Sequence, residues 1–472
     1  MLSASRTTYA GLIGVILVYL CLALLHVWIV RIYQPGDEKR HTKYVVVIET
    51  SDRLPTVEET RAATHPPLYY ALVAKTVMRG VESTEGIEGA VRAARCVSVF
   101  FGAVALLFAF LIIRLLLPNH PALAVHTTGI MAVIPSYSNN CAVLGNDSLS
   151  LASQFAMIYL ALLILLRGPS WPRCLILALT LSIVALSRVS GVLVMPVALF
   201  AVAAGTWWNV EGSPRRRALL ATAIPMTLIA WVAATSGWFY GGNISASGDL
   251  TGQSELLQQV RNHPVRSPFA VMLDPRKWLE IHDETWGRLA GSIFIRGSLE
   301  GLARAVTIVS LLGAAIALWQ VHVWERMCDW RSPRFFAWLV VAGVFASVFL
   351  PTLVYHARGG GLHQRYTFGA LYVISLALAM GFTWTGRRIA PVLGYSATFI
   401  IAYSVNVTYA AILAGKVRTF PIEQALAASI KHAAPMTAML VVGLMVGFVV
   451  IVYALATLHR PLRLGGSTGE PR

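Results

Sequence analysis

Charged side chains are scarce in this sequence. Asp, Glu, Lys and Arg make up 13% of its 472 residues, whereas 56% of the residues are hydrophobic. A soluble domain carries roughly 25% charged residues. The mean hydropathy is +0.65. A chain with so few charges cannot cover the surface of a soluble protein of this length, so the composition excludes an ordinary soluble enzyme and indicates an integral membrane protein.

Closely spaced cysteines and internal repeats are missing as well. The five cysteines are scattered along the chain, without the close pairs that a zinc site or a disulfide framework needs. No period of about 20–50 residues indicates a solenoid. The formal net charge is +16, but the basic residues lie mostly in short segments between apolar runs, where they act as topology signals. We therefore expect no nucleic-acid partner.

Long hydrophobic runs, by contrast, are abundant. Apolar windows of roughly 17–25 residues, long enough to cross a bilayer core, predict an all-α polytopic membrane protein with about 12 transmembrane helices in a single integral membrane domain, 1–472. The first window is longer than a signal-peptide core and no small-residue cleavage site follows it, so we expect it to be retained. The predicted spans are 9–30, 95–117, 121–137, 147–166, 172–187, 190–207, 217–236, 299–320, 334–355, 366–384, 391–413 and 435–458.

The short loops predict the orientation of these spans. With a cytoplasmic N-terminus, the inside loops, including the run Arg215-Arg216-Arg217, hold about twice as many basic residues as the short outside loops. Both termini are then cytoplasmic. Two long extracytoplasmic loops, 31–94 and 237–298, are too long to obey the charge rule. In the first of them, the apolar residues from Leu68 to Met78 have helical spacing, which predicts an amphipathic helix on the membrane surface, started by the preceding prolines.

The first long loop carries the strongest candidates for proton transfer. Asp37 and Glu38 directly follow the first span, and His41 comes three to four residues later, close enough to share one helical face. A carboxylate at this position could act as a general base toward a hydroxyl or an amine. The three residues could also hold a divalent cation, although no further ligands are visible and the metal is unknown. Each acid is equally compatible with a solvated loop residue.

Further polar residues map to the same outer level of the membrane. Arg188 interrupts a long apolar stretch, where an arginine at mid-bilayer would cost about 2.5–3.5 kcal/mol. A turn between two helices would relieve that cost, and a lipid phosphate held by the guanidinium is the functional alternative. Arg365 could likewise snorkel to the interface, and Asn146 or Asp147 could cap the following helix. The whole set at this level is Asp37, His41, His65, Arg92, Arg95, Asn146, Asp147, Arg188, Arg358, His363 and Arg365.

Taken together, these motifs resemble the GT-C superfamily of membrane glycosyltransferases, which use polyprenyl-phosphate sugars as donors and include protein O-mannosyltransferases and aminoarabinose transferases. The resemblance covers most of the chain. It rests on the Asp-Glu pair in the first outer loop and on four further motifs, His65-Pro66-Pro67-Leu68-Tyr69-Tyr70, Asn146-Asp147, Ser187-Arg188-Val189-Ser190-Gly191 and Gln364-Arg365-Tyr366.

The resemblance implies a GT-C-like fold and an inverting glycosyltransferase in a bacterial cytoplasmic (inner) membrane, with its active site facing outside. The sugar would pass from a polyprenyl-phosphate donor to a lipid, glycan or protein acceptor. Asp37 becomes the catalytic carboxylate, accompanied by Glu38, and Arg188, Arg365 and Arg358 are expected near the donor phosphate. Supporting, acceptor-binding or metal-binding roles are expected for His41, His65, Tyr69, Asn146 and Asp147.

Two other functions remain open from the sequence. A transporter or flippase for a lipid-linked glycan or other solute would fit twelve spans with a long loop after the first and the seventh, because such a chain can be divided into two related halves. The two loops share no motif, however, and few ionisable residues lie deep in the spans, which favours the transferase. A glycan ligase or polymerase with an oligosaccharide donor is the third possibility.

Overall fold

The computed structural model describes residues 2–33, 37–252, 264–286, 298–320, 332–383, 389–413 and 434–458. In these segments the regular elements are helices, and no strand occurs among them. Among the described residues, eight helices are long and apolar enough to cross a membrane, and four shorter apolar helices accompany them. Each of the predicted spans coincides with one of these helices. The prediction of an all-α polytopic membrane protein is therefore confirmed.

The long elements are α1 (Leu2–Ile29), α4 (Arg79–Leu116), α5 (Pro121–Val133), α7 (Asp147–Arg167), α8 (Trp171–Ser187), α10 (Met195–Asn209), α11 (Pro214–Ser247), α15 (Ser298–Gln320), α17 (Pro333–Ala357), α18 (Leu371–Thr383), α19 (Ile389–Leu413) and α21 (Ala434–Leu458). Shorter elements connect them. These are α2 (Glu38–Ser51), η1 (Arg61–Thr64), α3 (Leu68–Val73), η2 (Ala74–Met78), α6 (Pro135–Asn140), α9 (Val189–Val192), α13 (Pro268–Leu273), α14 (Pro275–Thr285) and η3 (Gln364–Ala370).

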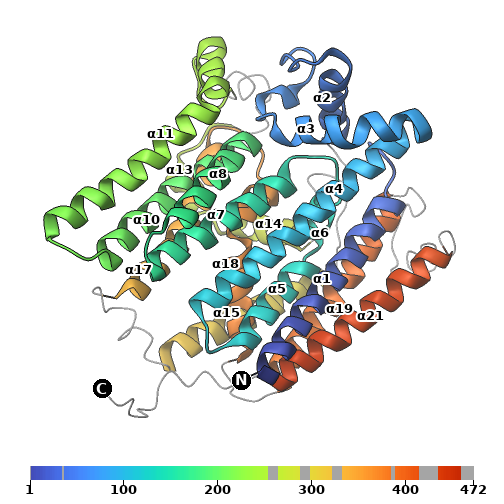
Figure 1. The fold of residues 1–472 in the computed structure, drawn as a ribbon. Coiled ribbons are helices and arrows are strands. Elements are labelled where there is room, and N and C mark those ends of the chain that lie inside the picture. Colours follow the sequence, from blue (N-terminus) through green and yellow to red (C-terminus); the bar gives the residue numbers. More distant parts are fainter. Residues whose placement is uncertain are drawn as a thin grey trace.

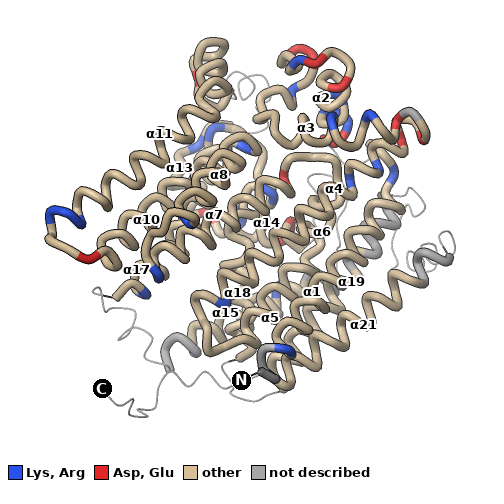
Figure 2. The backbone as a smooth tube through the Cα atoms, in the orientation of Figure 1, with Lys and Arg blue, Asp and Glu red and all other residues tan. Residues whose placement is uncertain are grey.

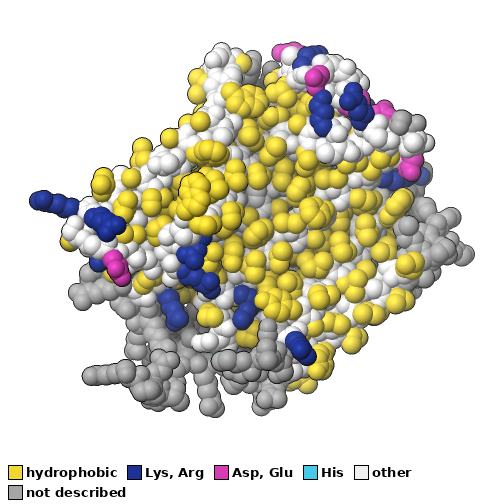
Figure 3. Space-filling model, in the orientation of Figure 1, with side chains coloured by type: hydrophobic (Ala, Val, Ile, Leu, Met, Phe, Trp, Pro, Cys, Tyr) yellow, Lys and Arg dark blue, Asp and Glu magenta, His cyan; other side chains and the backbone are white. Residues whose placement is uncertain are grey.

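The long helices pack into one bundle. α1 runs along α21, α4 along α7, and α15 along α18 (Figure 1). Their inward faces form a continuous hydrophobic core that extends from Val15 on α1 to Leu458 on α21. Lys and Arg gather near the two ends of the bundle (Figure 2), and hydrophobic side chains cover the middle of the visible face (Figure 3). This distribution matches an apolar bilayer core between two polar interfaces.

The first long segment between predicted spans, 31–94, forms a small cap at the end of the bundle opposite the N-terminus (Figure 1). The predicted helix is present, because α3 begins at Leu68 directly after Pro67. The predicted position of this helix on the membrane surface is wrong. Tyr69 and Tyr70 are buried against α2 and α4 in a second hydrophobic core. The apolar face of α3 packs against protein because α2 folds back over it.

Three predicted boundaries shift. α4 starts within the expected first loop and bends at Gly86, whose φ of +70° suits a residue without a Cβ atom. α11 continues to Ser247, past the predicted end at 236. The third span divides between Ile134 and Pro135 into α5 and α6, because proline cannot donate the hydrogen bond that a continuous helix needs.

Candidate functional site

A cavity of about 600 Å³ lies at the capped end of the bundle. Its lining comes from segments far apart in the sequence, namely the start of α2, η1, α7, α9, α17 and η3. Most of the predicted site residues meet here. Those that line the cavity are Asp37, His41, His65, Asp147, Arg188, Arg358 and Arg365.

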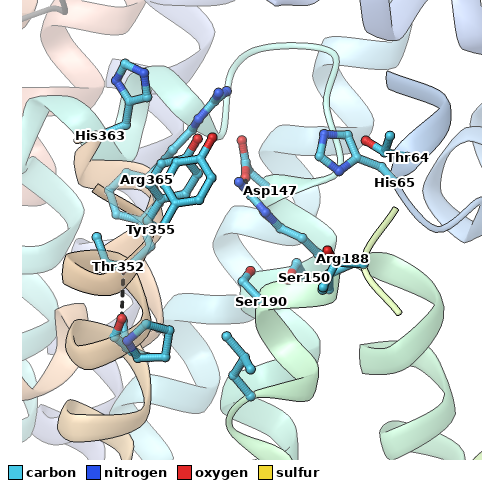
Figure 4. A pocket seen from close by; sticks show the side chains of 18 of the residues that line it. Thr64, His65, Asp147, Ser150, Arg188, Ser190, Thr352, Tyr355, His363 and Arg365 are labelled. Carbon is cyan, nitrogen blue, oxygen red and sulfur yellow. Dashed lines mark hydrogen bonds and ion pairs between the residues drawn. The ribbon is translucent and has the colours of Figure 1, made fainter. Parts of the chain in front are cut away.

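The cavity has two facing walls (Figure 4). Asp147 and Arg188 lie on one wall and Tyr355 and Arg365 on the other. The ring of Tyr366 lies near both arginines. The Cζ atoms of Arg188 and Arg365 are 5.8 and 5.6 Å from its centroid. Two guanidinium groups from different parts of the chain are therefore held in one space.

Arg188 reaches the cavity because the helix before it ends. α8 stops at Ser187, Arg188 has extended backbone (φ −162°, ψ 139°), and α9 follows. Asn146 fixes this break, because its Nδ2 donates a hydrogen bond to the carbonyl oxygen of Ser187 at 2.7 Å. The guanidinium forms an ion pair with Asp147. The predicted turn between two helices is thus confirmed. Asn146 stands at the N-cap position of α7, but its side chain makes no capping hydrogen bond.

Asp37 is held by two arginines. Nη2 of Arg365 lies 2.8 Å from one carboxylate oxygen, and Nη1 of Arg40 lies 2.9 Å from the other. Burial raises the pKa of Asp37, but the positive charge of Arg365, together with His41 and Arg40, outweighs burial and lowers the pKa to about 2. The carboxylate is ionised at neutral pH, and it is a weak base as long as the arginines stay bound to it.

Glu38, the next residue, points away from the cavity. Its carboxylate is fully buried and accepts two hydrogen bonds of 2.7 Å from Arg95. The backbone N–H groups of Tyr33 and Leu144 complete its partners at 2.8 and 3.2 Å. Arg95 also donates to the carbonyl oxygens of Val27, Val30 and Arg31. The pair therefore joins the end of α1 to α2 and α4.

The histidines of the site are neutral at pH 7. Nδ1 of His41 lies 2.8 Å from the Tyr70 hydroxyl, and its ring stacks on His65 with the ring centroids 5.8 Å apart. Burial lowers the pKa of His41 to about 3, that of His65 well below its usual range and that of His363 to about 4. Tyr69 lies behind them, outside the cavity lining, with its hydroxyl 2.6 Å from Ser98 Oγ.

The cation site suggested by Asp37, Glu38 and His41 is not assembled. Glu38 is turned toward Arg95, and Asp37 is occupied by Arg365 and Arg40. Within the described part of the chain, no group of three or more His, Cys, Asp or Glu side chains converges in a way that could hold a metal ion. These three residues therefore do not fit a metal.

Several lining residues were not predicted from the sequence. Arg40 and Arg61 add positive charge from α2 and η1, and Tyr355 adds a hydroxyl from α17. Gln154 lies seven residues after Asp147 on α7, so the two share a helix face. As the one amide side chain within the span 147–166, Gln154 carried a signal in the sequence. Tyr355, one aromatic residue among many, carried no comparable signal.

Comparison with known proteins finds similarity at the level of solved structures alone, since no family model and no curated protein matches the chain. ArnT from Cupriavidus metallidurans bound to undecaprenyl phosphate is similar over 93% of this chain and 76% of its own, with 12% identity and a TM-score of 0.47. The Archaeoglobus fulgidus oligosaccharyltransferase in complex with Zn and sulfate is similar over 82% of this chain and 53% of its own, with 14% identity and a TM-score of 0.43.

A second archaeal structure is similar over a comparable length. Oligosaccharyltransferase AglB from Archaeoglobus fulgidus, in complex with an inhibitory peptide and a dolichol-phosphate, matches over 93% of this chain and 55% of its own. The identity is 13% and the TM-score 0.40. This chain thus spans about half the length of the oligosaccharyltransferases. With TM-scores below 0.5 these are likenesses alone, and the chemistry has to be derived from the cavity.

Proposed function

We propose that this protein is a GT-C-like membrane glycosyltransferase that moves a sugar from a polyprenyl-phosphate donor to a lipid, glycan or protein acceptor. One observation carries the proposal, namely that two arginine–carboxylate pairs from distant segments face each other in one cavity. Asp37 is paired with Arg365, and Asp147 with Arg188. A guanidinium offers two parallel donors to a phosphate, and a carboxylate beside it can accept a proton.

The charge of the lining supports an anionic ligand. Five arginines line the cavity against three aspartates, Asp37, Asp147 and Asp249. Within the described chain, neither Arg61 nor Arg358 forms an ion pair with a carboxylate. Because the histidines are neutral, the excess positive charge attracts a phosphate, and Arg188, Arg365 and Arg358 are the groups that we assign to it.

In the proposed reaction Asp37 is the general base. It takes the proton of the acceptor hydroxyl while the acceptor oxygen bonds to the anomeric carbon on the face opposite the phosphate. The bond from that carbon to the phosphate oxygen breaks, and polyprenyl phosphate leaves with the electron pair, so the configuration inverts. Arg188 and Arg365 stabilise the charge that develops on the leaving phosphate.

Donor binding would also prepare the base. A phosphate oxygen that accepts hydrogen bonds from Arg365 competes with Asp37 for the same guanidinium. Loss of that partner raises the pKa of Asp37 from about 2 toward its ordinary value and makes the carboxylate a stronger base. Glu38 has no corresponding route to the reaction, since its carboxylate lies outside the cavity. We assign Glu38 and Asn146 to positioning the cavity walls.

We further propose that the cavity faces the outside of a bacterial cytoplasmic membrane and that both termini are cytoplasmic. The segment with α2, whose first turn lines the cavity, lies at the end of the bundle opposite the start of α1 (Figure 1). This arrangement agrees with the bias of basic residues in the short loops. A cysteine introduced at Thr56 should react with an impermeant thiol reagent in intact cells, and one at Ser213 should not. Ser254, a second outside position, falls outside the described residues.

The test is transfer by the purified protein. Undecaprenyl phosphate carrying a radiolabelled sugar is incubated with the protein and a membrane-lipid or peptide acceptor fraction. We expect label on an acceptor and release of undecaprenyl phosphate, with sugar-free undecaprenyl phosphate as a competitor. Movement of an intact lipid-linked sugar or another solute across liposomes, with no bond cleaved, would replace this proposal with the transporter or flippase.

A further inference from the structure

The floor of the cavity carries one amide, Gln154. It lies two helical turns beyond Asp147 on α7, which is about 10 Å deeper along the helix axis. The side chain is buried, and Nε2 donates a hydrogen bond of 2.8 Å to Ser150 Oγ. Oε1 and the second amide hydrogen remain for a ligand, because a carboxamide has two donors and an acceptor.

Two glycines place this amide where the cavity walls meet. A Cβ atom added to Gly369 would come within 2.8 Å of Gln154 Oε1, and one added to Gly191 would come within 3.5 Å of Nε2. Gly369 follows Arg365 by four residues, and Gly191 follows Arg188 by three. Gln154 is therefore enclosed by the same two segments that carry the phosphate-binding arginines, one turn below them.

Uncharged polar side chains line the cavity around Gln154. Among the described residues these include Ser150, Ser190, Ser347 and Thr352. Thr352 and Ser347 donate their hydroxyl hydrogens to their own helix, at Val348 O and Val344 O. Among the described lining residues, every carboxylate has a partner, Asp37 and Asp147 with arginines and Asp249 with Thr251.

We propose that the donor sugar is uncharged, a neutral hexose or pentose, and that Gln154 selects it. The inference rests on the proposed function and specifies its substrate class. A sugar attached to a phosphate between Arg188 and Arg365 lies within reach of the floor, where Gln154 and Ser150 pair with its hydroxyl groups. The carboxylates that the phosphate would release from the arginines stay at the level of the phosphate, and Asp147 lies about 10 Å from Gln154 along α7. The ammonium of a cationic amino sugar beside Gln154 would find an amide and hydroxyl groups there, in a cavity with excess positive charge, and a buried charge without a partner is strongly disfavoured.

The test measures donor binding at pH 7.5, so it needs no knowledge of the acceptor. Fluorescently labelled undecaprenyl phosphate is displaced from the purified full-length protein by three probes, namely undecaprenyl phosphate, its glucose derivative and its 4-amino-pentose derivative. We expect the glucose derivative to bind about tenfold more tightly than the amino-pentose derivative. In Gln154→Glu, which supplies the missing carboxylate, the order of these two probes should reverse.

Two further variants keep the test decisive. Asn119→Asp makes the same amide-to-acid change in an exposed turn between α4 and α5, far from the cavity, and should keep the parental order. If Gln154→Glu does not fold, Gln154→Leu should bind sugar-free undecaprenyl phosphate as the parent does and lose the preference for glucose. Equal or tighter binding of the amino-pentose derivative to the parent overturns the inference and leaves the proposed function standing. If undecaprenyl phosphate itself does not bind, the proposed function fails, and the inference fails with it.

Discussion

Two neighbouring acids, Asp37 and Glu38, both pair with an arginine, yet they lie in opposite settings. Glu38 and Arg95 have fully buried side chains, whereas those of Asp37 and Arg365 are 29% and 25% exposed and line the cavity. Every oxygen of Glu38 has partners within the protein. Asp37 and Arg365 can each give up the other as a partner and bind a ligand in the cavity. The sealed pair, Glu38 and Arg95, is closed off from ligands. The difference separates a structural ion pair from a reactive one of the same chemical type.

The buried Glu38–Arg95 pair determines where the Asp37–Arg365 pair forms. Arg95 satisfies carbonyl groups at the end of α1 that have no partner within the helix, and Glu38 ties Arg95 to the first turn of α2. Asp37 is the residue immediately before that turn. The buried pair therefore holds the start of α2 in the place where Asp37 meets Arg365.

The largest effect should come from breaking the sealed pair. Arg95→Leu leaves the Glu38 carboxylate buried without its counter-ion and should cost about 3–5 kcal/mol of folding stability, measured as a lower melting temperature in detergent. Arg92→Leu is the matched control, one turn earlier on α4, where a half-exposed pair with Glu88 has an N–O distance of 3.8 Å. It should cost about 1 kcal/mol or less. Equal losses in the two variants would contradict a structural role for Arg95.

The reactive pair should respond mainly in rate. Asp37→Asn keeps the shape of the side chain and removes the basic oxygen, so sugar transfer should fall by about 10²–10⁴-fold. Because Arg365 loses a carboxylate partner in a partly exposed pair, the melting temperature should fall as well, but by less than in Arg95→Leu. Asp52→Asn, at an exposed acid paired with Lys75, is the control and should retain activity. An active Asp37→Asn enzyme would transfer the role of base to Asp147.

Arginine-to-lysine changes should give a smaller, donor-specific defect. In Arg365→Lys or Arg188→Lys the charge is kept and the paired donors are lost, so the affinity for undecaprenyl phosphate should fall by about 1.5–3 kcal/mol, or one to two decades. The measurement is donor displacement, as above. Arg334→Lys, at the exposed start of α17 on the opposite end of the bundle, should leave it unchanged. Full affinity in both cavity variants would rule out these arginines as the phosphate site.

The smallest effect concerns pH. His41 has a pKa of about 3 in the folded protein because it is buried, against about 6.5 when unfolded, so below pH 6.5 the unfolded state binds the additional proton. Stability should therefore fall as the pH drops from 6.5 to 5, by about 1–2 kcal/mol for this residue, and His41→Gln should reduce the slope. The pKa of Asp37, lowered to about 2, affects stability only below about pH 4. Asp37→Asn should therefore keep the slope between pH 6.5 and 5.

The sequence by itself determined the helical membrane fold, because long apolar windows have no other stable arrangement in a bilayer. It also identified Asp37, Arg188 and Arg365 as one group, since alternating spans bring their ends to a common level. The cost of placing a charge within a continuous apolar helix made a turn at Arg188 one of two interpretations of the sequence, and the structure contains that turn.

Only the tertiary structure decided which of the two adjacent acids faces the cavity. Asp37 and Glu38 are equivalent by sequence, and their environments depend on how α2 is rotated against α4. That rotation is set by Arg95, 57 residues later than Glu38. The same applies to Gln154, whose amide becomes the cavity floor because Gly191 and Gly369 approach it from two other segments. Which distant residues become side-chain partners depends on how the helices pack. Local sequence patterns carry no information about that packing.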